Sequence, residues 1–153
     1  MRKLELKIPP VAVFLLVTLI MYCVKEVTPG FMIHVPFDDF VVSALVILSG
    51  FIGIAGVYEF RKVKTTVNPV KPEAASSVVN TSVFAYTRNP MYLALLLLII
   101  ALGLWWEHLS VIPCGILFVS YMNRYQIKPE ERALERLFGD EYLKYKNRVH
   151  RWI

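Results

Sequence analysis

The sequence predicts an all-α, polytopic membrane protein with four transmembrane helices and a C-terminal cytoplasmic amphipathic helical segment. Of its 153 residues, 56% are apolar and only 19% are charged. The charges are also clustered, because four long stretches carry none of them. A soluble domain would scatter its charges along the chain, so one membrane domain over residues 1–153 is the interpretation that remains. The apolar content excludes a disordered chain, and the presence of only two cysteines excludes a disulfide scaffold.

The four uncharged stretches are close in length to the thickness of a bilayer. Written as helices, they cover residues 8–24, 40–58, 89–106 and 109–123. At a rise of about 1.5 Å per residue they measure roughly 22 to 29 Å, against a hydrocarbon core of about 30 Å. The fourth stretch is the shortest, so a buried or re-entrant segment is the alternative to a span. Trp105 and Trp106 lie just before it, and tryptophan favours the membrane interface, so we expect the third and fourth helices to form a hairpin.

The first stretch also has features of a signal peptide. Arg2, Lys3 and Lys7 precede an apolar segment of suitable length. A cleavage site requires small residues after that segment, and residues 25–29, which read Lys-Glu-Val-Thr-Pro, do not provide one. We therefore interpret the stretch as a transmembrane helix that is retained.

The distribution of lysine and arginine predicts the orientation of the four helices. One side of the membrane holds residues 1–7, 59–90 and 123–153, with 3, 5 and 8 of these basic residues. The loops on the other side contain a single lysine or arginine, Lys25. Because basic loops stay in the cytoplasm, sixteen basic residues against one predict that both termini are cytoplasmic. The net charge of +5 then reflects topology and attraction to anionic headgroups, so no nucleic-acid partner is expected.

Two elements on the predicted cytoplasmic side are larger than simple loops. Residues 61–88 combine prolines with a run of serine, threonine and asparagine, which favours an ordered, extended crossing. In the tail, residues 124–153, a helix is predicted to begin near Glu130 and Glu131, since acidic residues favour a first turn, and to end at Gly139. The basic end of the chain predicts an amphipathic segment that lies on the membrane surface.

The residues at the start of the third helix permit an ordinary structural interpretation. Asn89 can cap the helix ahead of Pro90, which fits a first turn. Arg88 can extend to the lipid headgroups, and Tyr92 can lie at the interface. The same interpretation makes the tail an interfacial anchor, but it does not explain why two adjacent carboxylates follow a membrane span.

Three blocks of sequence resemble a known family. Residues 88–92 read Arg-Asn-Pro-Met-Tyr, residues 130–134 read Glu-Glu-Arg-Ala-Leu, and residues 138–142 read Phe-Gly-Asp-Glu-Tyr. Together with the hydrophobic hairpin between the first two, these blocks resemble the isoprenylcysteine carboxyl methyltransferase family, which belongs with the phospholipid N-methyltransferases among integral membrane methyltransferases. The resemblance covers residues 60–153, and the closing Arg-Val-x-Arg-Trp-Ile resembles short bacterial members.

Four positions depart from the pattern of that family. Asn89 replaces the usual histidine, as short bacterial members allow, and Ala94 and Ser82 replace glycines. Ala85 stands where a basic residue is common. A cofactor lying close to the helix would be sensitive to the methyl group of Ala94, so these departures bear on catalytic competence.

The resemblance implies a methyltransferase that uses S-adenosylmethionine, releases S-adenosylhomocysteine and has no nucleotide-binding sheet. It implies a cofactor site formed by Arg88, Asn89, Tyr92, Glu130, Glu131 and Leu134. The predicted catalytic residues among them are Arg88, Asn89, Tyr92 and Glu131. The chemistry of these groups agrees, because arginine can pair with the cofactor carboxylate and glutamate with its ribose or ammonium group. The spacing of cysteine and histidine residues does not predict a metal site.

The methyl acceptor stays open at this stage. A carboxylate is already nucleophilic, whereas a thiol or an amine has to lose a proton, for which Tyr92 and Glu131 are the candidates. The expected partners are membrane lipids and a lipophilic or small-molecule acceptor, and a lipophilic acceptor would enter sideways from the bilayer. The oligomeric state is left open.

Two alternatives remain beside methyl transfer. Membrane sterol reductases resemble this family in their C-terminal half and use NADPH, but they are much longer than this chain. The other alternative is a non-catalytic membrane protein that has kept the fold. For the preferred interpretation, the expected location is a prokaryotic inner membrane.

Overall fold

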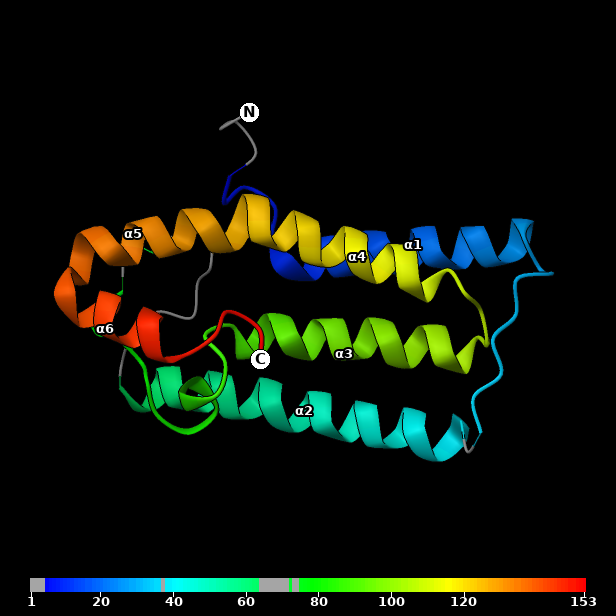
Figure 1. Cartoon of the computed structure of the whole chain (residues 1–153), viewed down its shortest axis with the longest axis horizontal. Helices are drawn as coiled ribbons and strands as arrows, with labels where there is room; N and C mark the ends of the chain where they lie inside the picture. Colours follow the sequence, from blue (N-terminus) through cyan, green and yellow to red (C-terminus); the bar gives the residue numbers. More distant parts are fainter. Residues whose placement is uncertain (1–4, 37, 64–71, 73–74) are drawn as a thin grey trace.

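The computed structural model describes residues 5–36, 38–63, 72 and 75–153. Within these ranges the regular elements are helical, as predicted, and the single β-bridge is an isolated one between Met32 and His108. The elements are α1 (Pro10–Val27), α2 (Asp38–Lys62), the 3-10 turn η3 (Ser82–Ala85), α3 (Pro90–Trp105), α4 (Val111–Tyr121), the π-helical η4 (Met122–Ile127), α5 (Lys128–Phe138) and α6 (Asp140–Arg148). Figure 1 shows that α1 to α4 share one long axis and that α5 and α6 lie at one end of the molecule.

Two helices, α1 and α2, are long and apolar enough to cross a membrane, and they coincide with the predicted spans at 8–24 and 40–58. Only 22% and 11% of their most apolar stretches are buried inside the protein, unlike the core helices of soluble domains. Large apolar side chains such as Leu15, Phe40 and Phe51 stay exposed. Apolar surface of this extent indicates a membrane protein. The third helix, α3, is apolar but shorter, with 16 residues.

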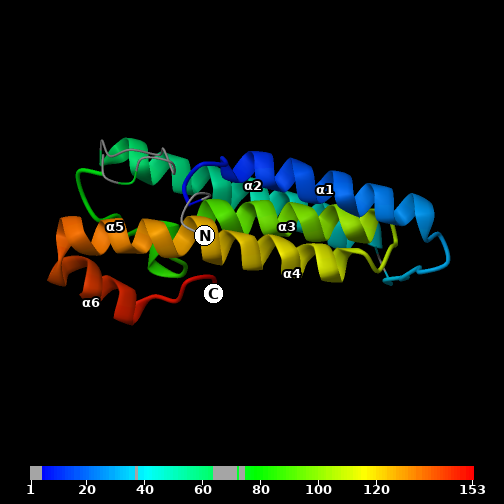
Figure 2. The ribbon, with the colours of Figure 1, turned by 90° about the horizontal axis from the view of Figure 1, so that it is seen from above.

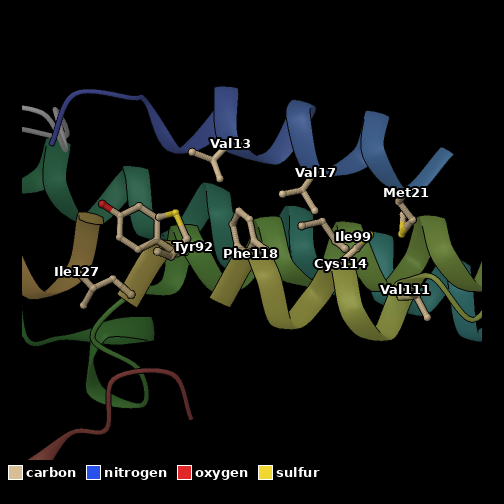
Figure 3. Close-up of a cluster of buried hydrophobic side chains, with 10 residues drawn as sticks. Val13, Val17, Met21, Tyr92, Ile99, Val111, Cys114, Phe118 and Ile127 are labelled. Atoms are coloured by element: carbon tan, nitrogen blue, oxygen red, sulfur yellow. The ribbon is translucent and has the colours of Figure 1, made fainter. Parts of the chain in front are cut away.

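The helix α3 lies at the centre of the bundle and contacts α1, α2 and α4 (Figure 2). Gly56 of α2 allows a close approach, because a Cβ added there would lie 3.2 Å from Cγ of Met91. The Ser49 hydroxyl of α2 donates a hydrogen bond to the Ala94 carbonyl over 2.8 Å. On the other side of α3, apolar side chains from α1, α3, α4 and η4 form the main core (Figure 3): Val13, Val17, Met21, Tyr92, Ile99, Val111, Cys114, Phe118, Met122 and Ile127.

The helices α3 and α4 form the predicted hairpin, with a tight turn around Glu107 and His108. His108 is only 3% exposed, and its Nε2 lies 2.8 Å from the carbonyl oxygen of Thr28, which ties the turn to the end of α1. The two helices approach so closely that a Cβ added at Gly103 would lie 2.3 Å from the Cβ of Val111. A glycine is therefore required at this crossing.

The helix of the fourth predicted span continues past Asn123. Here α4, η4 and α5 form one continuous helix, because the backbone angles at both junctions are α-helical (Figure 1). Pro129 explains the π-helical stretch: it has no N–H for the Tyr125 carbonyl four residues earlier, and its ring crowds that carbonyl. One extra residue in a π-turn rotates the following helix by about 100°. One helix therefore connects the segment of the fourth predicted span to the tail, and the position at which the chain leaves the membrane stays a prediction.

The last five residues, 149–153, fold back across the start of α3 (Figure 1), and we call them the C-terminal strap. The Arg88 backbone N–H donates to the His150 carbonyl over 3.0 Å, and the Trp152 indole N–H donates to Asn123 Oδ1 over 3.1 Å. Trp152 also packs against the main core. The strap is therefore bound to the bundle, while the predicted position of the basic end at the membrane surface stays a prediction.

Candidate functional site

A cavity lies where the start of α3 meets α5, α6 and the loop before α3. Its volume is about 70 Å³, which is below the usual range of about 300–1,000 Å³ for small-molecule sites, so a ligand of that size would need its walls to move apart. All six predicted site residues line it: Arg88, Asn89, Tyr92, Glu130, Glu131 and Leu134. The fold thus brings the first two sequence blocks together, while the roles assigned to these residues stay predictions.

Glu130 and Tyr92 connect the two helices that border the cavity. The Tyr92 hydroxyl donates a hydrogen bond to Glu130 Oε2 over 2.9 Å. Removal from water raises the pKa of the Glu130 carboxyl from 4.5 to about 7, although the hydrogen bond from Tyr92 opposes this rise. The neighbouring charge of Glu131 raises the pKa further. A carboxyl with a pKa near 7 can exchange a proton at neutral pH.

Glu131 has different surroundings, because two arginines bind its carboxylate. Arg151 donates from Nε to Oε1 over 3.0 Å and from Nη2 to Oε2 over 2.7 Å. Arg88 Nη2 lies 3.1 Å from Oε1. The hydrogen bond to Glu131 is the main reason that the pKa of Arg151 is raised. Both oxygens of Glu131 are therefore occupied, and the residue fastens the C-terminal strap to α5.

Arg88 keeps hydrogen-bonding capacity directed away from Glu131. Its side chain is 9% exposed, and its Nε and Nη1 have no hydrogen-bond partner among the residues that the structure describes. Buried N–H groups of this kind are rare in folded proteins. Within the same described part of the chain, the Ser77 hydroxyl, which also lines the cavity, is without a partner. An anionic, hydrogen-bonding ligand in the cavity would satisfy these groups.

Asn89 occupies the N-cap position of α3, but its side chain does not cap the helix. Its Nδ2 donates to the Arg151 carbonyl of the strap over 2.8 Å, and its backbone N–H donates to the Thr87 hydroxyl over 3.2 Å. The predicted capping role is therefore wrong, because the side chain binds the strap instead. Asn89 instead helps hold the strap over the cavity.

Leu134 belongs to the apolar wall of the cavity. It packs against a second, smaller core that joins α6 to the loop before α3: Val79, Phe84, Tyr142, Tyr145 and Val149. The Tyr145 hydroxyl donates to the Phe84 carbonyl over 2.8 Å. Burial raises the pKa of both tyrosines of this core, so their hydroxyls stay protonated. Flat aromatic surface and Leu134 together suit an aromatic ring.

An apolar groove adjoins the cavity on the side of the bundle. Met91 and Tyr92 line both the cavity and the groove. The other groove residues come from α1, α2 and α3, and all but one of them are apolar or glycine: Pro10, Val11, Ser49, Gly50, Gly53, Ile54, Val57, Ala94, Leu95 and Leu98. A cavity that contains charged residues and an apolar groove therefore meet at Tyr92.

Comparison with known proteins decides the family. The family described as phospholipid methyltransferase matches residues 39–141, which is more than half of the chain and includes all six residues of the cavity named above. The chain belongs to the phospholipid methyltransferase family. The resemblance that the sequence blocks predict is thereby confirmed.

The chain is also similar to an uncharacterized protein of Haemophilus influenzae. It is 44% identical over 63 residues, which are 41% of this chain and the whole of that protein. No solved structure matches the chain. Membership of the phospholipid methyltransferase family implies a methyltransferase, and the exposed apolar helices associate that activity with a membrane.

The structure locates the departures from the family pattern. Ser82 has φ +54°, a left-handed conformation in which glycine is free of strain and serine is not. Ala94 faces α2 and the groove and does not line the cavity. Ala85 is exposed. The methyl group of Ala94 therefore does not obstruct the cavity, and the cost at Ser82 is one of backbone strain.

The sequence-based site omits Arg151, which the structure brings to the edge of the cavity through Glu131 and Asn89. The signal was present in the closing Arg-Val-x-Arg-Trp-Ile motif, but periodicity assigns that motif to a membrane surface. The sequence-based site also omits Tyr142 and Tyr145 of the cavity wall. They lie on α6, and no pattern in the sequence shows that this helix packs beside the first block.

Proposed function

We propose that this member of the phospholipid methyltransferase family transfers a methyl group from S-adenosylmethionine to a lipophilic acceptor at the cytoplasmic face of a membrane. In this proposal the cavity holds the cofactor and the groove holds the acceptor. The observation that carries it is the junction at Tyr92 of two spaces. One is a cavity with buried Arg88 N–H groups that have no partner among the described residues, and the other is an apolar groove.

The residues of the cavity fit S-adenosylmethionine group by group. Its carboxylate matches Nε and Nη1 of Arg88, which lack a partner in the part of the chain that the structure describes, and its ammonium or ribose hydroxyls match Glu130. The wall formed with Leu134 and Tyr142 matches the adenine. When bound, the cofactor supplies an electrophilic methyl group on a sulfonium. The chain contributes position and exclusion of water, which a displacement reaction chiefly requires.

The surroundings of the two glutamates favour Glu130 as the proton acceptor for an amine or a thiol substrate. The carboxylate of Glu131 is already bound by Arg88 and Arg151. Glu130 has a pKa near 7 and accepts a hydrogen bond from Tyr92, which faces the groove as well. A carboxylate acceptor would need no such group, so the pair is expected to matter only for protonated nucleophiles.

The groove supports a lipophilic acceptor. Its walls are apolar, and two of them, α1 and α2, carry large exposed apolar surfaces. An acceptor with a hydrocarbon chain can therefore enter from the lipid and present its polar end at Tyr92. We include in the proposal that α1 to α4 all span the membrane, with both termini in the cytoplasm, as the charge distribution predicts.

Calorimetric titration of the detergent-purified protein with S-adenosylhomocysteine tests the cofactor. We expect saturable binding at one site, and no binding of NADPH under the same conditions. Binding of NADPH in place of S-adenosylhomocysteine would support a reductase and contradict the proposal. Binding of neither would support a non-catalytic member of the family.

The variant Arg88→Lys tests the site. Lysine keeps the charge but lacks the planar guanidinium with its several N–H groups. We expect several-fold weaker binding of S-adenosylhomocysteine or a larger loss, with a melting temperature in detergent close to that of the wild type. Arg136→Lys is the matched control, because Arg136 is exposed on α5 and does not line the cavity. Equal affinity for both variants would limit Arg88 to its ion pair with Glu131 and contradict a role in binding the cofactor.

A further inference from the structure

The π-helical segment η4 determines which way the two glutamates of α5 face. It lies between α4 and α5 in a continuous helix, and the glutamates follow it within four residues. A π-turn is less stable than an α-turn and needs support from its surroundings. If η4 relaxed to an α-helix, Glu130 and Glu131 would rotate by about 100° around the helix axis. Contacts that hold η4 therefore control the geometry of the cavity.

The segment before α1 provides such contacts, although it lies outside the cavity. The Glu5 carboxylate binds Arg124 of η4 through Nη1 over 3.1 Å and Arg132 of α5 through Nη2 over 2.6 Å. The side chain of Glu5 is only 15% exposed. One carboxylate therefore bridges the residues on both sides of Pro129, at the junction of η4 with α5.

The backbone of the same segment supplies a second, independent contact. The Leu6 N–H donates to the Tyr125 carbonyl over 3.0 Å. That carbonyl lacks its usual α-helical partner, because residue 129 is a proline without an N–H. Leu6 has φ +57°, a conformation that leucine rarely adopts, which indicates that the contact fixes the segment in a definite form.

We propose that Glu5 is a positioning residue for the cofactor site, which acts through Arg124 and Arg132 to hold η4 in its π-helical form. This inference rests on the proposed function. None of the three residues lines the cavity. Their effect on a ligand must therefore pass through the direction in which Glu130 and Glu131 point, and not through contact with the ligand.

The variants Glu5→Gln and Arg132→Gln test the inference in the full chain, with the affinity for S-adenosylhomocysteine as the readout. We expect each to weaken binding roughly three- to tenfold, the usual range for coupling through a network. Melting in detergent should change little, because the two arginines are 41% and 52% exposed and ion pairs of this kind contribute weakly to stability. Glu26→Gln is the matched control, since Glu26 is paired with Lys25 at the far end of α1.

Two double variants separate positioning from other effects. The double variant Glu5→Gln with Arg132→Gln has the net charge of the wild type. If the single variants act through a long-range charge effect, its affinity returns to the wild-type value. If they act through loss of the bridge, its affinity stays as weak as in either single variant. In the background Glu130→Gln, Glu5→Gln should cost less than it does in the wild type, because one of the positioned groups is absent. A general loss of folding would cost the same in both backgrounds.

The outcomes distinguish this inference from the proposed function. If the wild type does not bind S-adenosylhomocysteine, the proposed function fails and the inference fails with it. If the wild type binds and Glu5→Gln and Arg132→Gln bind equally well, only the positioning role is wrong. Purely additive losses with Glu130→Gln would also overturn it.

Discussion

At the scale of single residues, two adjacent glutamates of α5 have opposite environments. Glu130 faces the cavity with Tyr92 as its partner, whereas Glu131 is enclosed by Arg88 and Arg151. The difference arises because neighbouring positions on a helix point about 100° apart. One carboxyl thereby lies beside a tyrosine at the cavity, and the other lies between two guanidinium groups.

Substitution of each glutamate by glutamine should separate these roles. Glu131→Gln leaves two guanidinium groups facing a neutral amide, so we expect a loss of about 1.5–3 kcal/mol in the free energy of unfolding, the range for hydrogen bonds to charged groups. Glu130→Gln should lower the affinity for S-adenosylhomocysteine while the fold stays intact. Denaturant unfolding and calorimetry measure the two effects. Similar stability of the two variants would show that the bridge through Glu131 contributes nothing to folding.

The stability of the protein should depend on pH through Glu130. Its pKa is higher in the folded chain, about 7, than the ordinary value of 4.5, so folding favours the protonated carboxyl. The associated stability is fully present below about pH 4.5 and is lost as the pH rises through 7. We expect the melting temperature in detergent to fall between about pH 5 and pH 8, and to fall less in Glu130→Gln. An identical pH profile for both proteins would contradict the raised pKa.

Backbone strain at Ser82 predicts a stabilising substitution. With φ +54° the residue is in a region that disfavours every L-amino acid with a Cβ. Ser82→Gly should raise the free energy of unfolding by up to about 1 kcal/mol, because relief of strain exceeds the added entropy of the unfolded chain. Asn80→Gly is the control at an exposed position of the same loop without positive φ, and it should give no gain. Unfolding by denaturant measures both.

At the scale of elements, the crossing of α3 and α4 depends on one glycine. A Cβ added at Gly103 would meet the Cβ of Val111 at 2.3 Å and its Cγ2 at 2.5 Å. Gly103→Ala should therefore destabilise the protein by about 1–3 kcal/mol, as overpacking usually does. Gly115→Ala of α4 is the control, because the nearest atom to its added Cβ, Leu96 Cδ1, is 4.0 Å away. In thermal melting in detergent, the control should melt at or above the temperature of the wild type. Equal melting temperatures of the two variants would show that the hairpin can separate without a loss of stability.

The continuous helix of α4, η4 and α5 is the other element that determines the site. It connects the apolar bundle directly to the glutamates, and its π-helical part follows from Pro129. A proline inside a helix is usually interpreted as a beginning or an end. Here tertiary contacts from Glu5, Leu6 and Trp152 compensate for the disturbance, and the helix continues.

At the scale of the whole molecule, the proposed topology can be tested by cysteine labelling. In a Cys23→Ser background, which removes the exposed native thiol, we expect Gly30→Cys to react with a membrane-impermeant maleimide from outside the cell. Gly30 is exposed, and a Cβ there meets no atom within 4 Å. Lys144→Cys, exposed on α6, should react only in inverted vesicles. Labelling of both positions from one side would contradict the three spans that the proposed topology places between them.

The sequence by itself determined the helical class, the first two membrane-length helices, the hairpin of α3 and α4 and the six residues of the cavity. These features follow from local patterns: apolar runs, the tryptophans of the turn, and motif blocks whose order is preserved in the family. Arg88 and Glu130 can be assigned to the same site in this way, because each belongs to one of the sequence blocks that resemble the family.

Only the tertiary structure decided the division of roles between Glu130 and Glu131, the return of Arg151 and Trp152 across α3, and the support of η4 by Glu5. Each depends on contacts between residues more than 20 positions apart or on a rotation of about 100° within a helix. Composition and periodicity fix which face of a helix is apolar, but they do not fix which distant carbonyl or carboxylate a polar group meets. The physical reason is that polar groups are satisfied by whatever partner the packed chain brings within about 3 Å.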